Sequence, residues 1–220
     1  MCKIKLKPFH KCLIIFYVFV LYSCGTKPDL ARQNIDKSLL DEETCNPPCW
    51  HGLVIDKSTK EDVLSTLNKL PFVEHNAYRE HTVTWVNMPA IEIQFICASD
   101  HTTVCGGAMI TNNILRYLWT RLEYEFTLKD ATNRLGEPEY IVSEWPSISG
   151  KCSLEAVWNI HGMAAAIYDD SRYNECESIS DGNKISPSLI IESVSYFTPE
   201  DYGPIGGCCE RIVWPGFKDE

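Results

Sequence analysis

The chain has 220 residues, of which 20 are Lys or Arg and 30 are Asp or Glu, so its formal net charge is −10. Its hydrophobic fraction of 45% is ordinary for a globular protein and too high for a disordered one. An acidic surface repels phosphate backbones, and we therefore expect no nucleic-acid partner. The charge is compatible with a cationic protein or small molecule as partner, and also with a role in solubility alone.

The first 23 residues have the layout of a secretory signal peptide. Four lysines within residues 1–11 precede an apolar run at 12–22, which is shorter than the roughly 20 residues of a membrane-spanning helix. Leu21, Ser23 and Cys24 have a spacing that resembles the lipidation site of bacterial lipoproteins. The resemblance implies that Cys24 becomes the mature N-terminus and carries a lipid. Ordinary signal cleavage, with Cys24 a plain cysteine, is the alternative.

Export fits the number of cysteines. Eight of the 11 cysteines remain once the signal peptide and Cys24 are set aside, and an even set in an oxidising compartment predicts a disulfide framework. Neighbouring cysteines bridge each other only with strain, which favours separate partners for the last two. The expected disulfides join Cys97 to Cys105, Cys152 to Cys176, and the pair Cys45 and Cys49 to the pair Cys208 and Cys209.

The segment 24–44 is polar and lacks periodicity, so we expect a tether there and a folded part that starts near Cys45. The first predicted helix covers 59–68. Ser58 or Thr59 can cap its free N–H groups, with Glu61 or Asp62 completing a capping box. Its apolar residues recur at helical spacing. They are Val63, Leu64, Leu67 and Leu70.

Extended runs follow this helix at 81–88 and 91–97, where apolar and polar residues alternate in the second run. Asn112 and Asn113 separate two further apolar runs. Because asparagine tolerates the positive φ of tight turns, we expect a hairpin there.

A second helix is predicted over 127–136, and it matches the first at a constant offset of 68 residues. Gly136 and Pro138 are typical of a helix end. Extended runs follow again at 140–145, 154–160, 163–168 and 189–197. The repeated order of a helix followed by strands indicates an internal repeat. We therefore expect two units, at 45–122 and 123–220.

A capped helix with the pattern Thr-x-x-acid-apolar-x-x-x-Leu-Gly-x-Pro, leading into antiparallel strands, resembles the small lipoprotein of the outer-membrane barrel-assembly machinery. Two such units in tandem resemble the beta-lactamase-inhibitor-protein fold. The resemblance implies an α+β fold whose helices pack on one face of an antiparallel sheet. Composition and pattern alone also predict an antiparallel α+β fold. We expect two tandem helix-then-sheet repeats stapled by disulfides.

Three residue groups could hold a metal, although a simpler interpretation is preferred for each. Cys97, His101 and Cys105 are spaced evenly enough for zinc, but their hairpin position favours a disulfide. The spacing of Cys45 and Cys49, near His51, resembles that of copper-binding exported redox proteins. Calcium could bind an acidic loop, which is more simply a solvated loop. That loop contains Asp169, Asp170, Glu175, Glu177 and Asp181. We expect no metal or cofactor.

No motif for a catalytic nucleophile, a zinc protease or a phosphate-binding loop is present in the sequence. We therefore predict an envelope module that binds a protein or has a structural role, anchored to the membrane by its lipid. Its working surface would be the sheet face that the helices leave uncovered, with Trp85, Trp119 and Trp158 as candidate anchors. The alternative is an exported hydrolase that uses His161 with a nearby acid.

Overall fold

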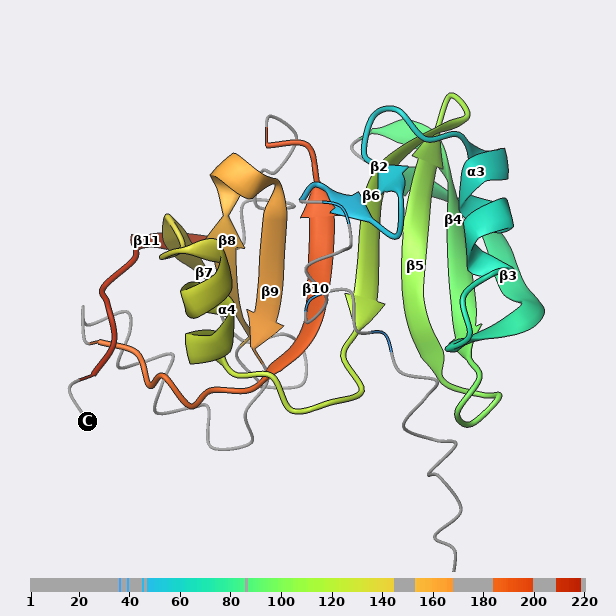
Figure 1. Ribbon diagram of the computed structural model, residues 1–220. Helices are drawn as coiled ribbons and strands as arrows, with labels where there is room; N and C mark the ends of the chain where they lie inside the picture. The colour runs from blue at the N-terminus through green and yellow to red at the C-terminus, as the bar shows by residue number, and fades with distance from the viewer. Residues whose placement is uncertain are drawn as a thin grey trace, which may run out of the picture. The chain divides into compact units, whose positions relative to one another are not determined.

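The computed structural model describes Asp36, Leu39, Cys45 and the ranges 47–85, 87–144, 153–167, 184–199 and 209–218. Residues Asn34–Glu220 form one compact unit. Within the described part, nine strands form one antiparallel sheet in the order β11-β7-β8-β9-β10-β6-β5-β4-β3 (Figure 1). The strands are β3 Val73–Trp85, β4 Met88–Cys97, β5 Val104–Thr111, β6 Ile114–Arg121, β7 Tyr140–Glu144, β8 Ser153–Trp158, β9 Met163–Ile167, β10 Ile191–Phe197 and β11 Cys209–Val213. Strands β1, Cys49–Trp50, and β2, Leu53–Val54, form a separate hairpin.

The predicted α+β fold of two tandem helix-then-sheet units is wrong, because the described part of the chain is mostly β-structure in one large sheet. That sheet is continuous across the expected boundary at residue 122. Strand β10 pairs with β6, joining residues 193–197 to residues 117–121. This pairing satisfies backbone groups that two separate sheets would leave exposed at their edges.

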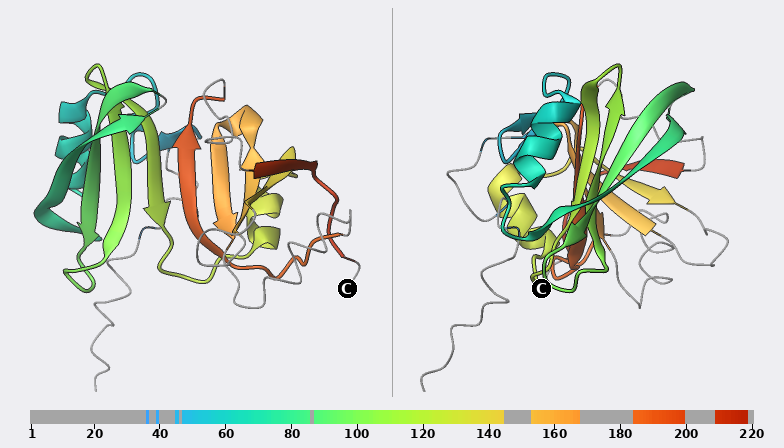
Figure 2. Two further views of the ribbon diagram at one scale, coloured as in Figure 1. Left: turned by 180° about the vertical axis from the view of Figure 1, so that it is seen from behind. Right: turned by 90° about the vertical axis from the view of Figure 1, so that its right-hand side faces the viewer.

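Both predicted helices are confirmed: α3 spans Lys60–Leu67 and α4 spans Leu128–Leu135. Each begins with a complete capping box. The backbone N–H of Asp62 donates to Thr59 Oγ1 at 3.2 Å, and the N–H of Thr59 donates back to the Asp62 carboxylate at 2.9 Å. Thr127 and Asp130 repeat this arrangement. Figure 2 shows that both helices lie on the same face of the sheet.

We expect Thr59→Ala and Thr127→Ala each to lower the free energy of unfolding by about 1 kcal/mol, because each removes the acceptor of one N-terminal N–H group. Urea unfolding measures this loss. The pKa of Asp62 is lowered by hydrogen bonds from the Thr59 backbone and side chain. The ionised Asp62 carboxylate therefore contributes to folding stability above its unfolded pKa. This contribution is lost as the pH falls through its lowered folded pKa. Ser65→Ala, at an exposed position of α3, is the control. An equal loss in that variant would contradict the capping interpretation.

Both helices bury one side against the sheet. Val63 and Leu67 of α3, and Leu128 and Ala131 of α4, are fully buried in one apolar cluster. The cluster also contains strand residues that alternate with residues of the opposite face. They include Ile93, Ala108, Leu118, Tyr196, Met163 and Trp158. These residues define the helix side of the sheet.

Two adjacent glycines in β5 let aromatic rings lie against opposite faces of the sheet. A Cβ on Gly106 would stand 2.2 Å from Phe95 Cζ, and a Cβ on Gly107 would stand 2.7 Å from Trp119 Nε1. No larger residue fits at either position without moving a ring or a strand. The following turn is the predicted hairpin, with positive φ at Asn112 (51°) and Asn113 (64°).

None of the helices in the described part has the length and hydropathy that crossing a bilayer requires. The predicted signal peptide and the lipid-bearing Cys24 lie outside the described residues.

Candidate functional site

The candidate site is the face of the sheet opposite the two helices, which we call the helix-free face (Figure 2). Directly paired residues of antiparallel strands point to the same face. One row of directly paired residues crosses all nine strands on this face. Along each strand, the residues next to this row point to the helix side. From one edge to the other the row contains Arg79, Gln94, Gly107, Trp119, Ser195, Ala164, Val157, Tyr140 and Val213.

Over β3–β6, the helix-free face carries half-exposed aromatic and sulfur-containing side chains. The half-buried Trp119 lies over Gly107. Met109 is half-buried and pairs with Tyr117. At the outer end of the β3–β4 hairpin, Trp85 pairs with Met88, which is 44% exposed. These side chains lie among the polar residues Arg79, His81, Glu92 and Gln94 of the same face, and we call this part of the face the β3–β6 surface.

The candidate anchors thus divide between the two sides of the sheet. Trp85 and Trp119 lie on the helix-free face. Trp158 does not, because it is fully buried on the helix side, where its Nε1 donates to the carbonyl oxygen of Gly136 at 2.7 Å. Trp158 is therefore a core residue and not an interface anchor.

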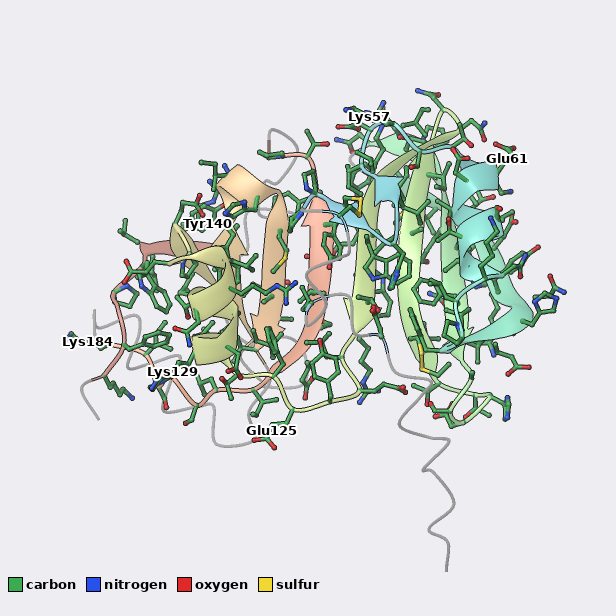
Figure 3. The ribbon with its side chains drawn as sticks, viewed as in Figure 1. Lys57, Glu61, Glu125, Lys129, Tyr140 and Lys184 are labelled. Carbon is green, nitrogen blue, oxygen red and sulfur yellow. A yellow bond between two sulfur atoms is a disulfide. The ribbon has the colours of Figure 1, made fainter. Side chains whose placement is uncertain are left out.

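The charges of the helix-free face differ from those of the rest of the molecule. Arg79, Arg121 and Arg211 lie on this face in β3, β6 and β11. Lysines in the described part lie only in helices and loops, as the labelled Lys57, Lys129 and Lys184 show in Figure 3. The other three are Lys60, Lys69 and Lys218. Protein interfaces are enriched in arginine and depleted of lysine relative to the rest of the surface.

Over β7–β10, the same face holds a second apolar cluster. Val142, Val157, Ala164 and Phe197 are buried there, and Tyr117 and Tyr140 pack against them. The guanidinium of Arg211 stands 4.9 Å from the centre of the Tyr140 ring, within the range of a cation–π contact.

Burial raises the pKa of the Tyr117 phenol to about 12, and the carboxylate of Glu155 adds to this rise, whereas a hydrogen bond with Ser195 opposes it. We expect ultraviolet titration to show this phenol ionising near pH 12 instead of pH 10.0. The protonated phenol of Tyr117 stabilises the folded state. This stabilisation is complete below the unfolded pKa of Tyr117, and it is lost as the pH rises through the raised folded pKa. The titration of Tyr117 is obtained by subtracting the ultraviolet absorbance of Tyr117→Phe from that of the wild type. If this difference titrated near pH 10.0, the burial of the phenol would be contradicted.

The disulfides agree with the prediction in part. Cys97 and Cys105 are bonded, as expected. Cys45 and Cys49 bond to each other, so their predicted pairing with Cys208 and Cys209 is wrong. The bend at Pro47 and Pro48 brings their Cα atoms to 5.5 Å, within the usual range for a disulfide. Cys152, Cys176, Cys208 and the side chain of Cys209 lie outside the described residues.

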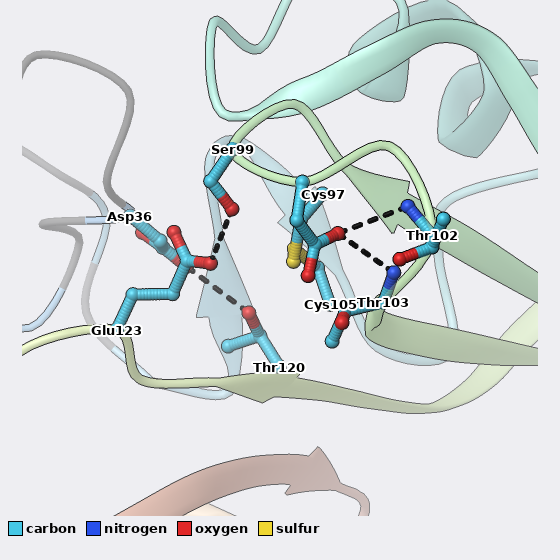
Figure 4. The surroundings of a disulfide bond; sticks show 9 residues. Asp36, Cys97, Ser99, Thr102, Thr103, Cys105, Thr120 and Glu123 are labelled. Atoms are coloured by element: carbon cyan, nitrogen blue, oxygen red, sulfur yellow. Dashed lines mark hydrogen bonds between the residues drawn. A yellow bond between two sulfur atoms is a disulfide. The ribbon is translucent and has the colours of Figure 1, made fainter. Parts of the chain in front are cut away.

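The loop between Cys97 and Cys105 does not form the zinc site that the sequence spacing allowed. The sulfur atoms of Cys97 and Cys105 are bonded to each other and are not thiolate ligands. His101 Nδ1 instead lies 2.7 Å from the carboxylate of Glu74. Glu123 does lie beside the two sulfur atoms, and it accepts a hydrogen bond from Ser99 at 2.8 Å (Figure 4).

A carboxylate that sequence patterns missed is buried on the helix side. Asp36 is 3% exposed and accepts hydrogen bonds from Trp50 Nε1 at 2.9 Å and Thr120 Oγ1 at 3.3 Å. Its other oxygen lies 3.0 Å from His51 Nε2. Leu39 is buried as well, so the folded part starts before the expected Cys45. A lone acid in a polar segment gives no local signal of burial.

His161, the candidate base of the alternative hydrolase, is the half-buried last residue of the 3-10 helix η1, Asn159–His161. Among the described residues, no hydrogen bond joins it to a carboxylate or hydroxyl. Within the ranges that the structure describes, His161 thus has no acid in hydrogen-bonding position.

Comparison with protein-family models, curated proteins and solved structures found no match to this chain.

Proposed function

We propose that the chain is a lipid-anchored protein of the cell envelope that binds another protein through the β3–β6 surface. The observation that supports this proposal is the composition of the surface. Trp119, Tyr117 and Met109 lie on neighbouring strands, with Arg79 and Arg121 around them. Tryptophan, tyrosine, methionine and arginine are the residue types enriched in protein interfaces, whereas lysine is depleted.

The position of Trp119 suits an anchor of binding. Its indole is held against Gly107, so the ring has a fixed place before a partner arrives, and less side-chain entropy is lost on binding. It lies on β6, between β5 and β10, close to Met109 and Tyr117, and tryptophan is among the residue types whose truncation costs most at interfaces.

Crosslinking in intact envelopes, followed by pull-down of the full chain, tests this proposal. We expect Trp119→Ala to reduce the yield of a reproducible partner by at least about tenfold, as for a hot-spot tryptophan. Ile160→Ala is the control, because Ile160 is 79% exposed in η1, outside the sheet. Circular dichroism would confirm that both variants are folded. If wild type recovers no protein, or if Trp119→Ala recovers as much as wild type, the proposal fails.

Membrane anchoring belongs to the same proposal. It rests on the spacing of Leu21, Ser23 and Cys24 in the sequence. Mass spectrometry of the protein from membranes should find a lipid-modified Cys24 as the first residue. An unmodified N-terminus at another residue would overturn the anchoring.

A further inference from the structure

We infer that the protein partner meets the β3–β6 surface with an acidic patch. This inference rests on the proposed function, because it names the chemistry of the partner at the same surface. It starts from the contrast between this surface and the whole chain, whose net charge is −10.

The β3–β6 surface carries two exposed arginines. Arg79 and Arg121 are both exposed on it. The carboxylates of these strands are already engaged: Glu92 Oε1 accepts a hydrogen bond from Gln94 Nε2 at 3.1 Å, and the carboxylate of Glu74 lies 2.7 Å from His101 Nδ1. His81, paired with Glu92, adds positive charge when it is protonated.

The two guanidiniums are available for a partner. In the described part of the chain, neither Arg79 nor Arg121 forms an ion pair or a side-chain hydrogen bond. By contrast, Arg116 pairs with Asp56 and Lys60 with Glu80. An arginine fork binds a carboxylate through two parallel hydrogen bonds, which a lysine cannot offer.

The two arginines are also placed around the candidate anchor. Arg121 lies two residues beyond Trp119 on β6, roughly 7 Å along the strand. Arg79 lies in the row of Trp119, three strands away, at roughly 14 Å. A partner that covers Trp119 would therefore bring its own side chains over both guanidiniums. Charge complementarity then favours carboxylates of the partner at those places.

Site-specific photo-crosslinking tests the inference. The full chain carries benzoylphenylalanine in place of Met109, which lies between Glu92 and Tyr117 in the register, and it is irradiated in intact envelopes. We expect partner peptides rich in Asp and Glu. We also expect Arg79→Glu combined with Arg121→Glu to lower the crosslink yield at least about tenfold, and salt to lower it in the wild type.

The matched control reverses two lysines that lie outside the sheet, Lys57→Glu with Lys69→Glu, and it should leave the yield within about twofold, since rim and remote charges contribute little. Crosslinks to basic or neutral peptides, or an unchanged yield after reversal of both arginines, would overturn the acidic partner and leave protein binding intact. The absence of any protein crosslink in the wild type, or crosslinks to lipid alone, would overturn both proposals.

Discussion

Replacing Asp36 by alanine should lower the free energy of unfolding by about 2–6 kcal/mol, because it leaves two buried donors unsatisfied, at about 1–3 kcal/mol each. Asp36 is buried and accepts a hydrogen bond from Thr120 (Figure 4). It also accepts one from Trp50 Nε1 and lies beside His51. Alanine would leave the indole N–H and the hydroxyl without their acceptor inside the protein. Urea unfolding monitored by tryptophan fluorescence gives the loss directly.

Asp36→Asn is the informative control, because its amide oxygen can still accept from Trp50 Nε1. We expect a smaller loss than in Asp36→Ala. If alanine changed the free energy of unfolding by less than about 1 kcal/mol, the value of a typical single hydrogen bond, the segment containing Asp36 would not be part of the folded unit.

The second large effect is expected at Trp158. Trp158→Ala should cost about 3–5 kcal/mol of unfolding free energy, as for other buried aromatic residues that are truncated to alanine. The side chain is fully buried and its Nε1 is bonded to the carbonyl oxygen of Gly136, just after α4. Its removal therefore opens a cavity and also loosens the end of that helix. Thermal unfolding, checked against denaturant unfolding, measures the loss.

Trp119→Ala serves as the comparison, because Trp119 is only half-buried on the helix-free face. It should lose less stability than Trp158→Ala while losing more of the partner. If the two variants lost stability equally and bound the partner equally, the assignment of one tryptophan to the core and the other to an interface would be wrong.

The features that sequence reasoning predicted correctly are local. Both helices were found because the hydrogen-bonding partners of a capping box, such as Thr59 and Asp62, are three residues apart. The hairpin at Asn112 and Asn113 follows from backbone preference at those two positions. The Cys97–Cys105 disulfide joins cysteines eight residues apart across one turn. Each of these depends on residues that lie close together in the chain.

The features that were missed depend on distant residues. The pairing of β6 with β10 merges the two expected units, and neither strand carries a local signal for its partner. In β8, Val157 and Trp158 are both fully buried, so no alternation could show which of them faces the helices. Asp36 accepts a hydrogen bond from Thr120, a residue 84 positions later in the chain. Residue patterns within one segment cannot reveal such contacts.

Protection of the β3–β6 surface in its native setting tests protein binding most directly. Hydroxyl radicals oxidise exposed methionine, tryptophan and aliphatic side chains, so the oxidation of each residue can be compared between intact envelopes and the purified full chain. We predict that Met109, Trp119 and Met88 are oxidised several-fold less in envelopes, because a partner covers them. Ile160, exposed outside the sheet, should be oxidised equally in both. Equal oxidation of Met109 and Trp119 in envelopes and in the purified chain would contradict a partner at this surface.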